Sequence, residues 1–331
     1  MTVSKIMLFF CIGMGLTIAL LPHLVWFIGW VVTRFTGHHL AYSPFGWTAL
    51  ALVLVFWGLM AWGYYIGRWR LETVPVEYSN AAIPEAFDGY RIVHISDLHL
   101  STFDDRPEHL AKIVSQINAQ DPDLVCFTGD LVTIGRQEAE PYTEILKSMK
   151  GKDGMASVLG NHDFLIYTED FGSEEEREAA VDSLAAYERD ILGWKLLRDE
   201  SLRIEKDGQA ITIVGVDNKN CSNQGFKTLD RGNLPEAMVG TEGFRILLSH
   251  DPSHWDTEVT STDIPLTLSG HTHAAQVRLF GWALSRLMFR QSDGRYDRDG
   301  QTLYINRGLG CTAPFRIGAD PEITVITLNK E

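Results

Sequence analysis

The chain has 331 residues, of which 45% are hydrophobic and 11% aromatic, and its formal net charge is −14. That apolar content is enough for a sizeable core and excludes a chain that is disordered throughout. Residues 1–80 hold four of the 29 basic side chains and two of the 43 acidic ones. Residues 81–331 therefore hold 25 basic and 41 acidic side chains, a net charge of −16. Nucleic-acid binding rests on Lys and Arg that neutralise phosphates, so this surface disfavours a nucleic-acid partner.

Two stretches before residue 67 carry no charged side chain, Ile6–Val32 and Phe45–Ile66. A helix needs about 20 apolar residues to cross a hydrocarbon core of ~30 Å, so each stretch is long enough. We therefore predict a transmembrane region over residues 1–67, with helices at about 6–32 and 45–66. Two alternatives stay open: a cleaved signal peptide followed by one span, and two helices buried in a soluble core.

The basic residues around these stretches predict an orientation. Lys5 precedes the first stretch and Arg68 and Arg70 follow the second, whereas the loop between them has only Arg34. Positive residues favour the cytoplasmic side of a membrane. We therefore expect a multi-pass membrane protein with two spans and a cytoplasmic C-terminal domain.

Residues 68–90 are predicted to form a connector with an edge strand near Val74–Tyr78, and residues 91–331 a single large domain. In the first part of that domain, short apolar runs alternate with helical patterns. The predicted strands cover 92–95, 124–128 and 155–159, and one helix buries Leu110, Ile113, Val114 and Ile117. Strands that alternate with helices indicate an α/β fold with a mainly parallel sheet covered on both faces. Further strands are predicted at 202–205, 211–216, 245–249, 265–269, 303–306 and 323–328.

The clearest single helix is predicted over Ser173–Leu192. Ser173 and Glu176 fit a capping box, and the acidic first turn complements the positive end of a helix. Its predicted buried stripe consists of Ala180, Leu184, Tyr187 and Ile191.

Polar residues follow five of the predicted strands, where open α/β sheets place their ligand crevice. They are Asp97-x-His99, Gly129-Asp130, Gly160-Asn161-His162-Asp163, Ser249-His250 and Gly270-His271-Thr272-His273. Oxygen ligands with imidazole nitrogen, and no thiolate, suit divalent Mn, Fe or Zn. Seven such ligands with one shared carboxylate suffice for two ions ~3.5–4 Å apart, the arrangement that promotes phosphoryl transfer. The alternative is a buried polar network without metal.

These motifs resemble the calcineurin-like metallophosphoesterase superfamily over about residues 90–328. The resemblance implies a four-layer α/β/β/α sandwich and two divalent metal ions. It implies that the first ion is held by Asp97, His99, Asp130 and His273, and the second by Asp130, Asn161, His250 and His271. It also implies that His162 stabilises the transition state or protonates the leaving oxygen, and that Asp163 hydrogen-bonds the imidazole of His162.

Two further segments, Gly89–His99 and Asn306–Gly310, are similar to a branch of small membrane-attached bacterial phosphodiesterases. Some members of that branch split the pyrophosphate of UDP-2,3-diacylglucosamine in lipid A synthesis. Protein phosphatases of the superfamily instead carry Glu at the position of Asp163. One departure from the branch is Ala274-Ala275, where two glycines are usual, and we expect the added methyl groups to narrow the pocket floor.

The sequence therefore predicts a membrane-anchored dimetal phosphoesterase that uses a metal-bound hydroxide to cleave a phosphodiester or pyrophosphate bond, with UDP-diacylglucosamine as an example of a lipid-linked substrate. The alternatives are a broad phosphodiesterase for soluble nucleotides and a non-catalytic metal-binding scaffold. Arg307 either contacts substrate phosphate or pairs with a nearby acid. Leu279–Phe289, rich in large apolar residues, is expected to be a lid, a membrane-facing flap or core.

Overall fold

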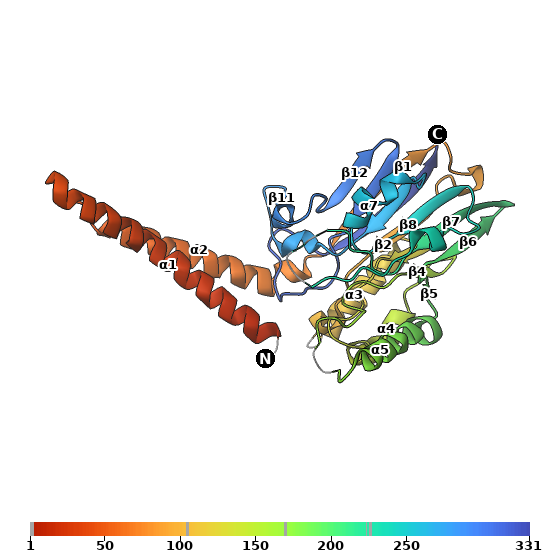
Figure 1. Cartoon of the computed structure of the whole chain (residues 1–331), viewed down its shortest axis with the longest axis horizontal. Helices are drawn as coiled ribbons and strands as arrows, with labels where there is room; N and C mark the ends of the chain where they lie inside the picture. The colour runs from red at the N-terminus through yellow and green to blue at the C-terminus, as the bar shows by residue number, and fades with distance from the viewer. Residues whose placement is uncertain (1–2, 104–105, 169–170, 223, 225–226) are drawn as a thin grey trace. The chain divides into compact units, whose positions relative to one another are not determined.

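The computed structural model describes residues 3–103, 106–168, 171–222, 224 and 227–331. The chain forms two compact units, one of Met1–Arg68 with Ala313–Ile317 and one of Trp69–Thr312 with Gly318–Glu331. We call them the helical unit and the sheet unit (Figure 1).

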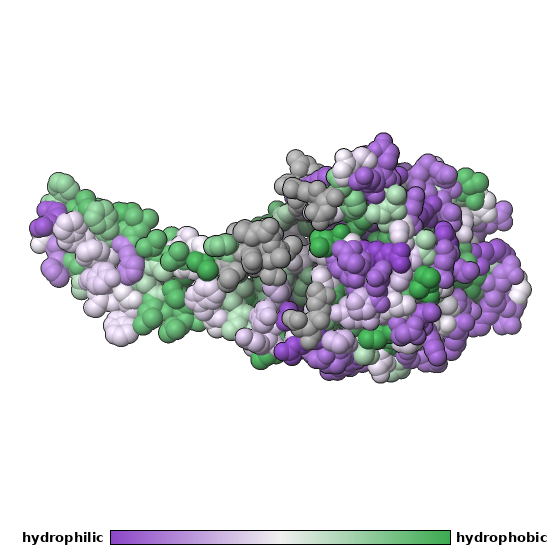
Figure 2. All heavy atoms as spheres, turned by 90° about the horizontal axis from the view of Figure 1, so that it is seen from below, coloured by the Kyte–Doolittle hydropathy of each residue, from purple (hydrophilic) through white to green (hydrophobic). Residues whose placement is uncertain are grey.

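The helical unit consists of the two uncharged stretches and the short segment Ala313–Ile317. α1 (Val3–Thr36) and α2 (Ser43–Tyr65) pack side by side (Figure 1). Many apolar side chains of these helices are exposed, among them Leu20 at 62% and Trp47 at 70%. Figure 2 shows hydrophobic residues spread over this unit, whereas hydrophilic residues predominate on the visible face of the sheet unit. Cys11–Thr36 and Ser43–Trp69 are long and apolar enough to cross a membrane.

The sheet unit contains two six-stranded sheets. The first has the strand order β1-β14-β2-β3-β4-β5 and the second β12-β13-β9-β8-β7-β6. The strands of the first sheet are β1 (Glu72–Asn80), β14 (Glu322–Lys330), β2 (Arg91–Ile95), β3 (Leu124–Phe127), β4 (Met155–Ser157) and β5 (Lys195–Leu196). Those of the second are β12 (Gly294–Arg298), β13 (Gln301–Ile305), β9 (Leu266–Ser269), β8 (Phe244–Leu248), β7 (Gln209–Gly215) and β6 (Glu200–Lys206). A separate short hairpin pairs β10 (Arg278–Leu279) with β11 (Trp282–Ala283).

The two sheets pack face to face with helices outside them. Apolar side chains of both sheets, such as Cys126 and Ile246, form one buried cluster between the sheets. A second cluster joins the first sheet to α3 (Pro107–Ala119), α4 (Thr143–Lys147) and α5 (Glu174–Ala186). A third joins the second sheet to α6 (Leu234–Ala237) and α7 (Ser253–Thr257). The predicted four-layer α/β/β/α sandwich is therefore confirmed.

The strand register brings the predicted polar motifs to one edge of the sandwich. β2, β3 and β4 are parallel, with Ile95 opposite Phe127 and Phe127 opposite Ser157. In the second sheet β8 and β9 are also parallel, with Leu248 opposite Leu268. Because all these strands end at the same edge, the residues that directly follow them meet there.

The predicted helix over Ser173–Leu192 forms as α5 followed by a π-helix, Tyr187–Leu192. The Ser173 Oγ accepts the N–H of Glu176 at 3.3 Å, so the predicted cap is present. A π-turn is wider than an α-turn, and the 3.6-residue spacing fails beyond its start. Ile191, expected in the buried stripe, is consequently 46% exposed, while Leu192 and Glu188 are buried.

Glu188 provides a test of this packing. Its carboxyl is fully buried, accepts one hydrogen bond from the Ser157 Oγ at 2.8 Å, and has no partner for Oε1 among the described residues. Burial, together with the charge of Asp163, raises the pKa of Glu188 well above its ordinary value. The folded protein therefore favours the protonated form, and the stability from this group is lost as pH rises above the unfolded value of about 4.3.

We expect Glu188→Gln to be more stable than the parent at pH 8 by about 1 kcal/mol, because the neutral amide is buried without the proton uptake that the carboxyl requires on folding. The difference should shrink below pH 5, where the parent carboxyl is protonated. Thermal unfolding of both full-length chains in detergent, at several pH values, measures it. A Gln variant that is less stable at pH 8 would show instead that the ionised carboxylate stabilises the fold.

Candidate metal centre

The structure brings the seven predicted metal ligands together at the carboxyl ends of the strands. All seven side chains are buried or nearly so: Asp97, His99, Asp130, Asn161, His250, His271 and His273. Asp97 and His99 follow β2, Asp130 follows β3, and Asn161 lies in the loop after β4. His250 follows β8, and His271 and His273 follow β9. Each half of the sandwich thus contributes to one centre.

One half of the centre forms around Asp97. The Nε2 atoms of His99 and His273 lie 3.1 Å apart, and the His273 Nε2 is also 3.1 Å from the Asp97 Oδ1. The Asp130 Oδ2 is 3.5 Å from the His99 Nε2. Two ring nitrogens and two carboxylates therefore converge on one small volume.

The other half forms around His250. Its Nε2 lies 3.0 Å from the Asn161 Oδ1, 3.2 Å from the His271 Nδ1 and 3.2 Å from the Asp130 Oδ2. The same carboxylate oxygen of Asp130 thus faces both halves of the centre.

Hydrogen bonds outside the centre fix which atoms point into it. The His250 Nδ1 donates to the Thr128 carbonyl at 2.6 Å, and the His271 Nε2 donates to the Gln224 Oε1 at 2.8 Å. The lone pairs of the His250 Nε2 and the His271 Nδ1 are thereby turned inward. The Asn161 Nδ2 donates to the Tyr167 hydroxyl at 2.9 Å, which turns the amide oxygen inward.

Sequence reasoning missed these supporting residues. Gln224 and Tyr167 lie in irregular segments without a periodic pattern, and no motif marks them. Asp251 was missed too, although it adjoins His250; its carboxylate accepts hydrogen bonds from Gln224 and from the Asn220 amide. The one available signal was the position of Asp251 directly after a strand-end histidine.

The electrostatics of the centre favour bound cations. Burial alone would raise the pKa of Asp130, but His250 and the other neighbouring histidines lower it far below its ordinary value. Burial lowers the pKa of His250, yet the charge of Asp130 outweighs burial and raises it to about 10. Burial instead lowers the pKa of His99 and His271. The two carboxylates attract positive charge, His99 and His271 offer nitrogen lone pairs to it, and a bound cation would displace the proton that Asp130 favours on His250.

The donor set and its geometry fit two divalent cations. Among the described residues, three groups place their ligand atoms within 4.8 Å of one another: Asp97, His99 and His273; His99, Asp130 and His162; and Asp130, His250 and His271. Carboxylate, amide and imidazole donors without thiolate suit borderline divalent ions. Asp130 belongs to two of these groups, as a bridging ligand must.

His162 and Asp163 point in different directions. The His162 Nδ1 hydrogen-bonds the Thr133 carbonyl at 2.9 Å, and its ring lies 4.7 Å from that of His99. The buried Asp163 carboxylate accepts backbone N–H groups of Asp130, Gly160 and Val132 at 2.7, 2.9 and 3.2 Å. The prediction that Asp163 hydrogen-bonds the His162 imidazole is therefore wrong. Asp163 instead joins the loop after β3 to the loop after β4, and burial together with the charge of Asp130 raises its pKa to about 7.

The backbone of the centre is held in a conformation that L residues rarely adopt. Five of the predicted ligands have positive φ: Asp97 (50°), His99 (39°), Asp130 (60°), His271 (72°) and His273 (48°). Such residues cluster at functional sites, where the surrounding structure must enforce them. A Cβ built at Gly129 would overlap the backbone of Gly160, so the two loops meet only because glycine stands there.

Ala274 and Ala275 continue this left-handed run, with φ of 54° and 49°. Glycine would adopt these angles without steric cost, whereas alanine pays about 1–2 kcal/mol. The Ala274 methyl is fully buried against Ala283 and Ala319. The methyl group of Ala274, which a glycine would lack, therefore packs the metal-binding loop against the β10–β11 hairpin.

Arg307 lies in a buried ion-pair cluster. Its guanidinium is 2.5 Å from the Glu322 carboxylate and 2.7 Å from that of Glu72, and its side chain is 5% exposed. The charge of Glu322 outweighs burial and raises the pKa of Arg307. Of the two roles expected for Arg307, this geometry favours pairing with nearby acids; contact with substrate phosphate stays untested.

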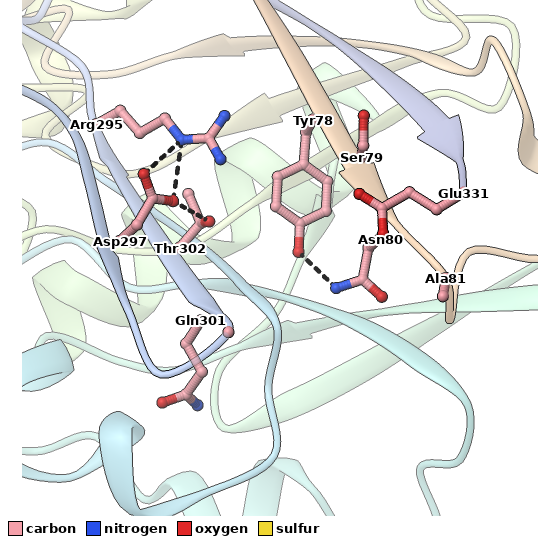
Figure 3. Close-up of a pocket in the computed structure, with 10 residues that line it drawn as sticks. Tyr78, Ser79, Asn80, Ala81, Arg295, Asp297, Gln301, Thr302 and Glu331 are labelled. Carbon is pink, nitrogen blue, oxygen red and sulfur yellow. Dashed lines mark hydrogen bonds and ion pairs between the residues drawn. The ribbon is translucent and has the colours of Figure 1, made fainter.

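A polar cavity of about 420 Å³ lies away from the centre (Figure 3). It is lined by the last residues of β1 and the first residues of β13, at the edge opposite the carboxyl ends of β2 and β9. Some of the labelled side chains pair with one another: Asp297 contacts Arg295 and Thr302, and Asn80 contacts Tyr78 (Figure 3). The residues that line this cavity include none of the seven predicted metal ligands.

The fold and the centre together define a dimetal phosphoesterase with buried His and Asp metal-binding groups. The sequence profile of the calcineurin-like phosphoesterase family matches residues 90–275, and the chain belongs to this family. It is 32% identical over 280 residues to the uncharacterized metallophosphoesterase YkuE of Bacillus subtilis, covering 81% of this chain and 89% of that protein. It is 30% identical over 309 residues to a transmembrane protein with metallophosphoesterase domain of Danio rerio, covering 90% of this chain and 66% of that protein.

Proposed function

We propose that this protein is a membrane-anchored phosphoesterase that hydrolyses a phosphodiester or pyrophosphate bond of a lipid-linked nucleotide. The observation that carries the reaction class is the Asp130 carboxylate shared between two buried clusters of His and Asp ligands. Two helices long enough to cross a bilayer support the anchoring. The Danio rerio relative, whose name describes a transmembrane protein, supports it as well.

In this proposal the two clusters hold two divalent ions. One site uses Asp97, His99, Asp130 and His273, and the other uses Asp130, Asn161, His250 and His271. When bound, two such ions supply a water nucleophile at neutral pH and neutralise charge that develops on the phosphate oxygens. Asp163 serves as a positioning residue, since its carboxylate holds the loops that carry Asp130 and Asn161.

His162 is the proposed proton donor. Its Nδ1 donates to the Thr133 carbonyl, so a second proton on the imidazole is carried by Nε2. In the protonated form, the Nε2–H can therefore give its proton to the leaving oxygen as that P–O bond breaks and a new P–O bond to water forms. The proton lost by water passes to solvent.

The proposed substrate is a nucleotide whose phosphate is linked to a lipid, such as UDP-diacylglucosamine. The similarity of Gly89–His99 and Asn306–Gly310 to membrane-attached phosphodiesterases supports this choice. The distribution of Lys5, Arg68 and Arg70 around the spans supports a catalytic domain in the cytoplasm. We retain 1–67, 68–90 and 91–331 as the membrane region, connector and catalytic domain of this proposal.

Two substitutions separate metal binding from proton donation. We expect Asp130→Asn in the full chain to lose both metal content and hydrolysis of a soluble aryl phosphodiester. His162→Gln should keep two metal ions and lose activity by roughly 10²–10⁴-fold, more with an alkyl leaving group than with an aryl one, because the alkyl group needs the proton. Metal analysis and steady-state kinetics measure both effects, with His109→Gln as the control. Unchanged activity in a well-folded, metal-loaded Asp130→Asn would refute the assignment, and metal uptake without hydrolysis in the parent would indicate a scaffold.

We expect the Tyr167 hydroxyl to raise the metal affinity of the site that contains Asn161. Tyr167→Phe removes the hydrogen bond that orients the Asn161 amide, and such changes typically weaken metal affinity by about 10–100-fold. Calorimetric titration should show weaker binding of one ion and unchanged binding of the other. Tyr187→Phe, which likewise removes a hydroxyl with two hydrogen-bond partners, is the matched control. Equal effects of both variants would argue against a positioning role for Tyr167.

Substrate class is tested by direct comparison. The full chain in nanodiscs should cleave UDP-diacylglucosamine with a kcat/KM at least about tenfold higher than that for soluble nucleotide diesters. Mass spectrometry identifies the products, and Asp130→Asn gives the background. Higher efficiency on the soluble nucleotides would favour the alternative of a broad phosphodiesterase.

A further inference from the structure

The segment Arg278–Arg290, which we call the flap, has an apolar outer surface. Its exposed large side chains are Leu279 (47%), Phe280 (108%), Trp282 (44%), Leu284 (41%), Leu287 (72%) and Met288 (52%). In the described part of the sheet unit, the other exposed large apolar residues are Ile134, Ile191 and Val239, which are far apart in sequence. Concentrated apolar exposure of this kind marks an interaction surface rather than ordinary scatter.

The inner side of the flap is fixed to the metal-binding loop. Ala283 is fully buried with Ala274 and Ala319, and the Phe289 ring packs edge-on against the His271 ring at 5.5 Å between centroids. Phe280 and Gly281 have φ of 52° and 81°, which forms the tight turn between β10 and β11 and leaves Phe280 fully exposed. The flap thus projects from the sheet unit on a buried base, and its Phe289 contacts the predicted metal ligand His271.

The charge of the flap is opposite to that of its surroundings. It contains Arg278, Arg286 and Arg290 and no acidic residue, although residues 81–331 carry a net charge of −16. Arg278 and Arg286 lie 3.3 and 3.7 Å from Asp293, and Arg290 lies 2.6 Å from Asp256. Their side chains remain 36%, 43% and 75% exposed, so guanidinium N–H groups are still available at the surface.

We propose that the flap inserts its apolar side chains into the interfacial region of a lipid bilayer, with its arginines at the headgroup phosphates. Exposed Phe, Trp and Leu beside Arg are the composition of interfacial membrane-binding segments. The flap then brings the lipid surface next to His271, so that a lipid-linked phosphate can reach the centre without its acyl chains leaving the bilayer. The delivery of a lipid-linked phosphate rests on the proposed function, whereas the insertion of the flap into a bilayer does not.

A bilayer fits this surface better than a second copy of the chain does. A second copy would bring together two regions that each carry a net charge of −16, and this like net charge opposes their association. A bilayer with anionic lipid offers both apolar depth and negative charge. The two predicted spans belong to the same chain and would therefore tether the sheet unit to such a bilayer.

Insertion is measurable in the full chain reconstituted in nanodiscs of phosphatidylcholine and phosphatidylglycerol. An environment-sensitive fluorophore is attached at Phe280→Cys, with Val239→Cys, another exposed apolar site, as the control. The half-buried Cys221 is replaced by Ser in both chains, and the remaining cysteines are buried. Nitroxides on the lipid acyl chains should quench the label at 280 at least about threefold more than the label at 239. Equal quenching would overturn the proposal, as would the absence of lipid quenching together with disulfide pairing between unlabelled Phe280→Cys chains.

A second measurement addresses delivery of substrate. The double variant Phe280→Asp with Leu287→Asp should lower the ratio of lipid-linked to soluble substrate turnover by about tenfold, whereas Val239→Asp should leave it unchanged. An unchanged ratio in the double variant would overturn the delivery role. If the parent does not cleave lipid-linked substrate at all, the proposed function fails, and the quenching experiment still decides whether the flap inserts.

Discussion

The shared carboxylate of Asp130 is the interaction on which the rest of the centre depends. Its Oδ2 faces His99 on one side and His250 on the other, and its Oδ1 accepts the backbone N–H of His162 at 2.8 Å. Its own backbone N–H donates to Asp163. One residue therefore couples the two halves of the ligand set to the loop with the proposed proton donor. Because neighbouring histidines outweigh burial and lower its pKa, the carboxylate of Asp130 keeps its negative charge in the centre.

Holding Asp130 in this position has a structural cost that the fold must offset. Asp97, Asp130 and His273 all adopt left-handed backbone angles, at about 1–2 kcal/mol each. The hydrogen bonds of Asp163 and the absence of side chains at Gly129 and Gly160 let the loops approach closely enough to enforce these angles. The large buried apolar clusters on both faces of the first sheet stabilise the fold and so offset the free-energy cost of these backbone angles.

The sequence predicted elements with a strong local pattern and missed contacts that depend on tertiary structure. The apolar spacing of α3 repeats within a few residues, so this helix was predictable. The polar residues after β2, β3 and β9 directly follow apolar strands, so their meeting at one edge of the sandwich was predictable too. Gln224 acts on His271, which is far from it in sequence, and Tyr167 acts on Asn161 across an irregular loop; no local pattern signals either role. Asp163 was misassigned because adjacency to His162 says nothing about side-chain direction in a tight loop. Ile191 was misplaced because a π-turn changes the helical period, and that change has no signature in residue type.

The acidity of residues 81–331 bears on which substrate the centre can serve. A net charge of −16 repels nucleotides that approach through solution, and at physiological salt this repulsion extends about 8 Å from the surface. A lipid-linked nucleotide arrives by a different route, since its acyl chains confine it to the bilayer and its encounter with the protein is two-dimensional. The arginines of the flap would then provide an approach with a favourable local charge. The same acidic surface that penalises a soluble substrate is therefore compatible with a substrate presented by the membrane beside His271.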